Sequence, residues 1–103
     1  MESLWKYYKE ENWQYVLEKV VPIEFHKNKF FYDEISQGRI FPDDIYKVLA
    51  TFSEFMFCHN IDKYKSWLKS KQTMLDGYTP IEIVQKPKGV ETLKEYLLRY
   101  PKI

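Results

Sequence analysis

The stretch Leu75–Val84, which reads Leu-Asp-Gly-Tyr-Thr-Pro-Ile-Glu-Ile-Val, combines a tight turn, a helix start and an apolar anchor. Its Asp-Gly dipeptide favours a turn because Gly77 adopts a positive φ at little cost. Thr79 is a suitable N-cap, and Pro80 fits the first helical position, where its missing N–H has no partner. Glu82 completes a capping box with the threonine. The stretch therefore predicts a turn followed by a short helix, a packing device without an obvious catalytic group.

Apolar residues at helical spacing on both sides of this stretch predict an all-α fold, a compact bundle of about five to six helices. The segment that opens at Pro42 has two acidic residues in its first turn, which suit the helix dipole. The expected helices cover residues 3–20, about 28–37, 42–56, 61–68, the turn-helix 76–85 and 90–99. Ser3 could cap the first of them, and Pro101 ends the last.

Several of the expected helices carry an apolar face, and in the helix opened by Pro42 it consists of Ile45, Val48, Leu49, Phe52 and Met56. The helix capped by Asn60 places Ile61, Tyr64, Trp67 and Leu68 on one face, and the last helix turns Val90, Leu93 and Leu97 inward. In the last helix, Glu95 and Arg99 are four residues apart and are expected to form an ion pair.

Residues 21–40 are the least defined part of the pattern. Val21–Pro22 ends or kinks the first helix, because proline lacks the N–H that a helix interior needs. Between Ile23 and Tyr32 the phenylalanines fit neither the helical nor the strand period, so a helix competes with a short strand or hairpin. We favour the helix, with Gly38 as its stop.

The 103 residues are expected to form one helical domain, with residues 1–40 as an N-terminal helical part. Sixteen basic and fifteen acidic residues give a net charge of +1, which argues against a dedicated nucleic-acid module. The aromatic content of 18% is unusual. The rings either fill the core or form, in part, an exposed contact surface.

Catalytic and metal-binding patterns are missing from the sequence. Cys58 and His59 are neighbours that point about 100° apart on a helix, so they do not converge on one metal ion. A pairing of Cys58 with His26 has no local signature of a nucleophile and its base. We therefore expect no enzyme, no cofactor and no metal. A single cysteine, the lack of a signal peptide and the lack of a long apolar run favour a cytoplasmic protein without a membrane span.

The lysines of residues 63–71 surround Tyr64 and Trp67 and suggest one alternative function. Basic residues beside aromatic rings can follow a nucleic-acid backbone and stack on a base. The two rings share their helix face with Leu68, however, which favours a core position with the lysines as a solvated rim.

Several segments are similar, in order, to those of a known family. They are the helix opened by Pro42-Asp43-Asp44, the helix Asn60–Leu68 that ends in Trp67-Leu68, the stretch Leu75–Val84, and Gly89 before the last helix. The third is similar to the signature Leu-Gly-Gly-x-Thr-Pro-x-x-Leu-Leu, with Asp76 where glycine is common. From about residue 41 to residue 100 the chain thus resembles the toxin-binding domain of Xre/MbcA/ParS-type antitoxins, from bacteria or phages.

This resemblance implies a small non-catalytic inhibitor from a toxin–antitoxin system. Members neutralise a cognate toxin, typically a RES-type enzyme that consumes NAD⁺, by docking their C-terminal helical part over its active site. The resemblance assigns structural roles to Trp67, Leu68, Gly77, Thr79, Pro80, Glu82 and Gly89. It places the partner contacts at Tyr78, Arg99, Tyr100, Lys102 and Ile103.

Other functions stay open on the sequence alone. One is a nucleic-acid-binding transcriptional regulator. Another is a phage or mobile-element accessory protein that binds a host factor through the same kind of surface. A homodimer would cover surplus aromatic surface through a symmetric interface.

Overall fold

Helices make up all of the regular structure in residues 3–99, the part of the chain that the computed structural model describes. The prediction of an all-α bundle is confirmed. The α-helices are α1 (Glu10–Tyr15), α2 (Val21–Glu24), α3 (Lys29–Ile35), α4 (Asp43–Thr51), α5 (Ser53–Phe57), α6 (Ile61–Leu68), α7 (Pro80–Ile83) and α8 (Gly89–Arg99). Single 3₁₀ turns occupy Leu4–Tyr7, Phe25–Asn28, Ser36–Gly38 and Thr73–Leu75, and Val16–Val20 is a π-helical turn.

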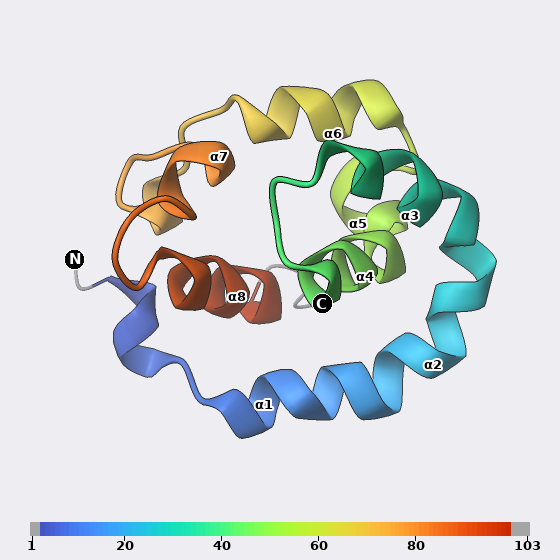
Figure 1. Ribbon diagram of the computed structural model, residues 1–103, viewed down its shortest axis with the longest axis horizontal. Helices are drawn as coiled ribbons and strands as arrows, with labels where there is room; N and C mark the ends of the chain where they lie inside the picture. Colours follow the sequence, from blue (N-terminus) through green and yellow to red (C-terminus); the bar gives the residue numbers. More distant parts are fainter. Residues whose placement is uncertain (1–2, 100–103) are drawn as a thin grey trace.

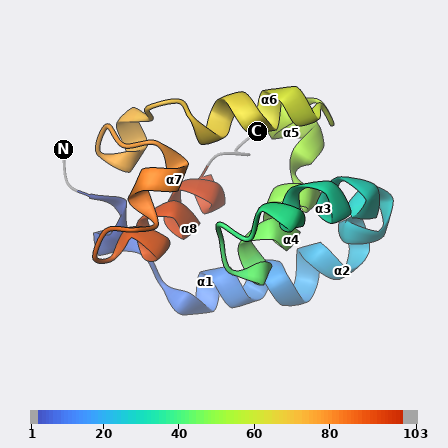
Figure 2. The same ribbon diagram turned by 45° about the horizontal axis from the view of Figure 1, so that its top comes forward.

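Helices α4 and α8 lie next to each other in the middle of the molecule (Figure 1). Both views show α6 on one side of this pair and the α1–α2 segment on the other (Figures 1 and 2). Helix α7 packs beside α8, and so does the first 3₁₀ turn, Leu4–Tyr7. The first and last helical segments of the described chain are therefore neighbours.

Aromatic rings fill much of the core. Phe31 stacks on Phe57 with ring centroids 5.9 Å apart, and Phe57 meets Tyr64 and Trp67 edge-on at 5.5 and 5.4 Å. The buried aromatic residues are Trp13, Phe31, Phe41, Tyr46, Phe57, Tyr64, Trp67 and Tyr96, whereas Trp5, Tyr7, Tyr15, Phe30, Phe55 and Tyr78 are exposed. Part of the rings thus fill the core, and part are exposed.

The expected helix over residues 3–20 is wrong in its first part. Tyr8 and Lys9 have extended backbones and separate the 3₁₀ turn Leu4–Tyr7 from α1. Ser3 does not cap this turn, because its hydroxyl donates instead to Asp76, at 2.8 Å. The break lets the short N-terminal turn pack across α8, a long-range contact that helical periodicity does not encode.

Pro22 does not end the N-terminal helix. The π-helical turn Val16–Val20 precedes it, and Pro22 stands in the first turn of α2, where a missing N–H is tolerated. On the inner face, the Trp13 indole N–H donates to Asp44 at 2.8 Å, and Lys94 reaches the same carboxylate oxygen at 3.5 Å. This polar cluster fixes α1 to both central helices.

Within residues 23–32, all of which the structure describes, helical conformation prevails over the strand or hairpin. The helix expected over about 28–37 is present as α3 and the 3₁₀ turn that follows it. The helical segment ends at Gly38, as expected, and Arg39 directly after it takes the positive φ of 52°. The left-handed residue that follows the helix is therefore an arginine and not a glycine.

The long helix expected from Pro42 is divided at Phe52 into α4 and α5. The Thr51 hydroxyl donates to the Lys47 carbonyl at 2.8 Å, a bond that often bends helices. The Thr51 carbonyl in turn accepts from the Asn28 amide at 3.4 Å, a tertiary contact with the preceding segment. The Thr51 carbonyl is therefore bonded outside the helical ladder, whereas the Phe52 N–H still donates to the Val48 carbonyl at 3.0 Å.

From residue 60 to residue 99 the predicted elements are confirmed. The Asn60 side chain accepts from the amides of Asp62 and Lys63, as an N-cap does. In α8, Leu93 and Leu97 are fully buried, and Val90 is half-buried against the core.

Candidate interaction surface

Tyr78 is exposed at the tip of the turn that the sequence specifies. Asp76 and Gly77 both have positive φ, 58° and 83°, so the predicted turn is confirmed. The turn is closed by hydrogen bonds from Gly77 N–H to the Gln72 carbonyl and from Gln72 N–H to the Tyr78 carbonyl, at 2.9 and 3.1 Å. The Lys86 ammonium lies 4.7 Å from the centroid of the Tyr78 ring, within cation–π range. A rigid backbone thus presents a ring that is 36% exposed.

The predicted capping box orders the chain directly after Tyr78. Glu82 N–H donates to the Thr79 hydroxyl at 3.1 Å, and Thr79 N–H donates to the Glu82 carboxylate at 2.9 Å. The hydrogen bond from the Thr79 backbone is the main cause that lowers the pKa of Glu82 below its ordinary value. Pro80 is in the first helical position and is buried. Thr79, Pro80 and Glu82 therefore form the capped start of α7, as the sequence predicts.

Gly89 allows α7 to approach the start of α8. A Cβ on Gly89 would lie 1.6 Å from the Ile83 carbonyl oxygen, which no side chain tolerates. Trp67 and Leu68 are likewise structural, because both are buried, and the Trp67 indole donates to the Tyr96 hydroxyl at 3.3 Å. The motif residues hold the turn, α7 and α8 together, and the Tyr78 side chain between them stays exposed.

The first described residues of the chain contact the Tyr78 turn and the loop after α7, a link that the sequence analysis did not predict. The Ser3–Asp76 hydrogen bond ties the start of the chain to the turn, and the Lys88 ammonium lies 5.9 Å from a Trp5 ring centroid. We call Trp5, Tyr78, Lys86 and Lys88 the lysine–aromatic face. The signal in the sequence was the two lysines around Pro87, but nothing local pairs them with the first residues of the chain.

The Arg99 side chain, which the resemblance places among the partner contacts, interacts with two residues of the chain itself. Its Nε atom lies 2.7 Å from the Glu95 carboxylate, so the predicted i, i+4 pair is confirmed. Its guanidinium carbon lies 5.1 Å from the Tyr7 ring centroid. Arg99 therefore helps to fix the N-terminal turn on α8. The other expected contacts, Tyr100, Lys102 and Ile103, lie outside the described residues.

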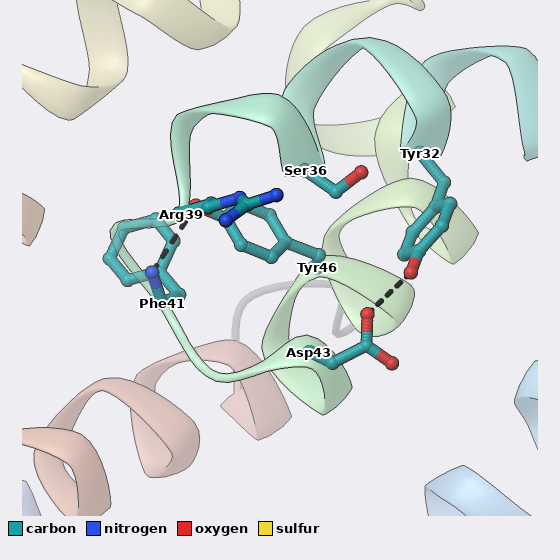
Figure 3. A pocket seen from close by; sticks show the side chains of 6 residues that line it. All are labelled: Tyr32, Ser36, Arg39, Phe41, Asp43 and Tyr46. Atoms are coloured by element: carbon teal, nitrogen blue, oxygen red, sulfur yellow. Dashed lines mark hydrogen bonds between the residues drawn. The ribbon is translucent and has the colours of Figure 1, made fainter.

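A separate pocket opens where α3 meets the start of α4 (Figure 3). Its volume is about 260 Å³. Its lining residues are Tyr32, Ser36, Arg39, Phe41, Asp43 and Tyr46. Tyr32 donates a hydrogen bond to Asp43, and this bond is the main cause that lowers the pKa of the Asp43 carboxyl. Asp43 also pairs with Lys47 at 3.2 Å and so stays ionised at neutral pH.

The cysteine and the two histidines lie on the surface. Cys58 is exposed with Lys63 Nζ 3.8 Å from its sulfur, and the His59 ring contacts Phe30 at a centroid distance of 6.1 Å. His26 lies against Phe25 instead. In residues 3–99, no group of three or more His, Cys, Asp or Glu side chains is placed to hold a metal ion. None of the described helices has the length and apolar character needed to cross a bilayer.

Comparison of the chain with protein-family models, with curated proteins and with solved structures found no match. The function is therefore inferred from the surface itself.

Proposed function

We propose that the chain is a small non-catalytic protein-binding domain that inhibits a partner by covering its active-site entrance. The resemblance of residues 41–100 to antitoxins suggests that the partner is a RES-type toxin that consumes NAD⁺. The observation that carries the proposal is the lysine–aromatic face, where a capped turn holds Tyr78 next to Lys86 and the docked N-terminal turn adds Trp5.

The side chains of this face are of the kinds that dominate protein interfaces. Tyr and Trp are enriched among the residues that contribute most to binding, because each buries a large area at a low entropic cost. Trp5 is 37% exposed, close to the value for Tyr78, so each ring is anchored on one side and available on the other. Such half-buried rings need little ordering when a partner binds.

The distribution of charge along the chain favours a partner whose surface is acidic. Residues 61–103 contain nine basic and five acidic side chains, whereas residues 10–60 contain five basic and nine acidic ones. The lysine–aromatic face lies beside the basic segment and includes two of its lysines. We infer that the partner presents acidic groups around an apolar centre, and that salt slows their association.

The experiment is co-expression of the tagged chain with the product of the neighbouring reading frame, followed by measurement of the complex. We expect copurification and loss of the partner's NAD⁺ consumption. Tyr78→Ala should weaken binding about thirtyfold, the loss typical of an interface anchor. Tyr15→Ala is the matched control, because Tyr15 is 62% exposed and belongs to α1, which contributes no residue to the lysine–aromatic face. A neighbour without affinity or toxicity, or equal effects of the two variants, would contradict the proposal.

Nucleic-acid binding is the second proposal and has its own test. The lysines of residues 63–71 are exposed, but Tyr64 and Trp67 are buried, so neither of these two rings is available for stacking. Binding would then depend on phosphate contacts alone, with affinity that falls steeply with salt. A mobility-shift assay without a retarded band at low salt would exclude it.

A further inference from the structure

The pocket between α3 and α4 contains a positively charged side chain on a strained backbone. Arg39 has a φ of 52°, in the left-handed region that favours glycine. Gly38, directly before it, does not take this conformation. A Cβ on Gly38 would meet only ordinary contacts, 3.7 Å or more from Ile40 and Tyr46. The left-handed backbone conformation is thus at the arginine, although the neighbouring glycine would adopt it at a lower cost. Backbone strain from a positive φ at a residue other than glycine occurs at functional sites.

The charge of this arginine is not neutralised within the fold. Among residues 3–99, Arg39 forms no ion pair, and the Ser36 hydroxyl forms no hydrogen bond. The carboxylate of the pocket, Asp43, is occupied by Lys47 and by the Tyr32 hydroxyl. One guanidinium and one hydroxyl are therefore the donors that remain for a ligand.

The wall of the pocket is aromatic and its backbone amides are already used. The Tyr46 hydroxyl accepts hydrogen bonds from the amides of Ile40 and Phe41, at 2.6 and 3.2 Å (Figure 3 draws the second). These amides cannot cradle an anion, so recognition depends on the side chains. The volume of about 260 Å³ is smaller than that of most small-molecule sites and suits a group of side-chain size.

We propose that this pocket binds a carboxylate on a short apolar stem. The planar Arg39 guanidinium donates two parallel hydrogen bonds to the carboxylate, and the Ser36 hydroxyl donates a third. The stem lies against Phe41 and Tyr46. One positive charge matches a monoanion, and the nearby Asp43 disfavours a phosphate dianion. The carboxylate belongs either to a free small acid or to an acidic side chain of a polypeptide, and the site does not depend on the function proposed above.

The test is a titration of the isotope-labelled full chain followed by NMR, with propionate, an uncharged propionamide control and methyl phosphate. N-acetylglutamate N-methylamide represents the polypeptide source. We expect saturable shifts at Arg39 Nε and at the Ser36 amide with propionate, and none with propionamide. Tighter binding of the glutamate derivative would assign the site to a polypeptide, and tighter binding of propionate to a free acid. Methyl phosphate binding more tightly than both, or no saturable shift with either carboxylate, would overturn the proposal.

Two variants separate binding from folding. Arg39→Gly should abolish the shifts and raise the melting temperature, because glycine relieves the positive φ. Arg39→Lys keeps the charge but loses the planar fork, so binding should weaken about tenfold. Lys69→Gln, a charge change outside the pocket lining, is the control and should bind like the wild type. Unchanged binding by Arg39→Gly would contradict the proposed role of the guanidinium.

Discussion

The three glycines of the chain should respond to alanine in three different ways. Gly89→Ala places a Cβ 1.6 Å from the Ile83 carbonyl oxygen and 2.7 Å from its carbonyl carbon. Backbone cannot move aside as a flexible side chain does, so α7 and α8 must separate and the packing between them is lost. We expect a destabilisation of about 3 kcal/mol, at the upper end for overpacked sites. This outcome reverses the usual gain from alanine in a helix, about 1 kcal/mol.

The other two glycines supply matched controls for the same substitution. Gly77 has a φ of 83° and open space around its Cβ position, so alanine there should cost only the left-handed conformation, about 1 kcal/mol. Gly38 has neither a positive φ nor a close contact, so alanine should be neutral or stabilise by about 0.5 kcal/mol. Urea unfolding followed by fluorescence of the buried tryptophans measures all three. A Gly89→Ala variant as stable as Gly38→Ala would refute the close approach of α7 to α8.

Three further predictions concern polar groups. Thr79→Ala removes the acceptor for the first-turn amide of α7 and should cost about 1 kcal/mol in urea unfolding, whereas Thr79→Ser should be near neutral. Arg99→Ala leaves the buried Glu95 carboxylate unpaired and should cost about 2 kcal/mol; a loss of partner binding without a loss of stability would instead favour the free-anchor role. The folded-state pKa of Asp43 lies below its ordinary 3.8, chiefly through the Tyr32 hydroxyl, so its stabilisation is present above about pH 4 and is lost as pH falls through the folded pKa. The difference in melting temperature between wild type and Asp43→Asn should therefore shrink between neutral and strongly acidic pH, and a constant difference would contradict this cause.

The parts of the fold that the sequence predicted well are those that local chemistry specifies. The capping box at Thr79 and the N-cap at Asn60 each involve residues a few positions apart. The N-terminal part was predicted poorly because distant contacts decide it. Ser3 bonds to Asp76 instead of capping its own helix, and no periodicity reveals a partner 73 positions away.

The difference between local and distant contacts also explains which surface residues the sequence did not reveal. The turn that exposes Tyr78 is encoded locally, whereas Trp5 reaches Lys88 through a tertiary contact. Arg39 was missed because glycine is the usual left-handed residue and Gly38 precedes it. Only the three-dimensional arrangement shows that the arginine has this conformation and lines a pocket.

The π-helical turn Val16–Val20 has a consequence for the length of the N-terminal helix. In a regular α-helix Trp13 and Val21 would point about 80° apart, since each residue advances by about 100°. The wider turn absorbs one residue and reduces this angle to about 20°, so both side chains reach the core. Removal of one residue from this turn would restore ordinary α-helical geometry and leave both side chains in place. An added residue would instead rotate everything that precedes it away from the interior, so relatives of this chain should tolerate shortening here and not lengthening.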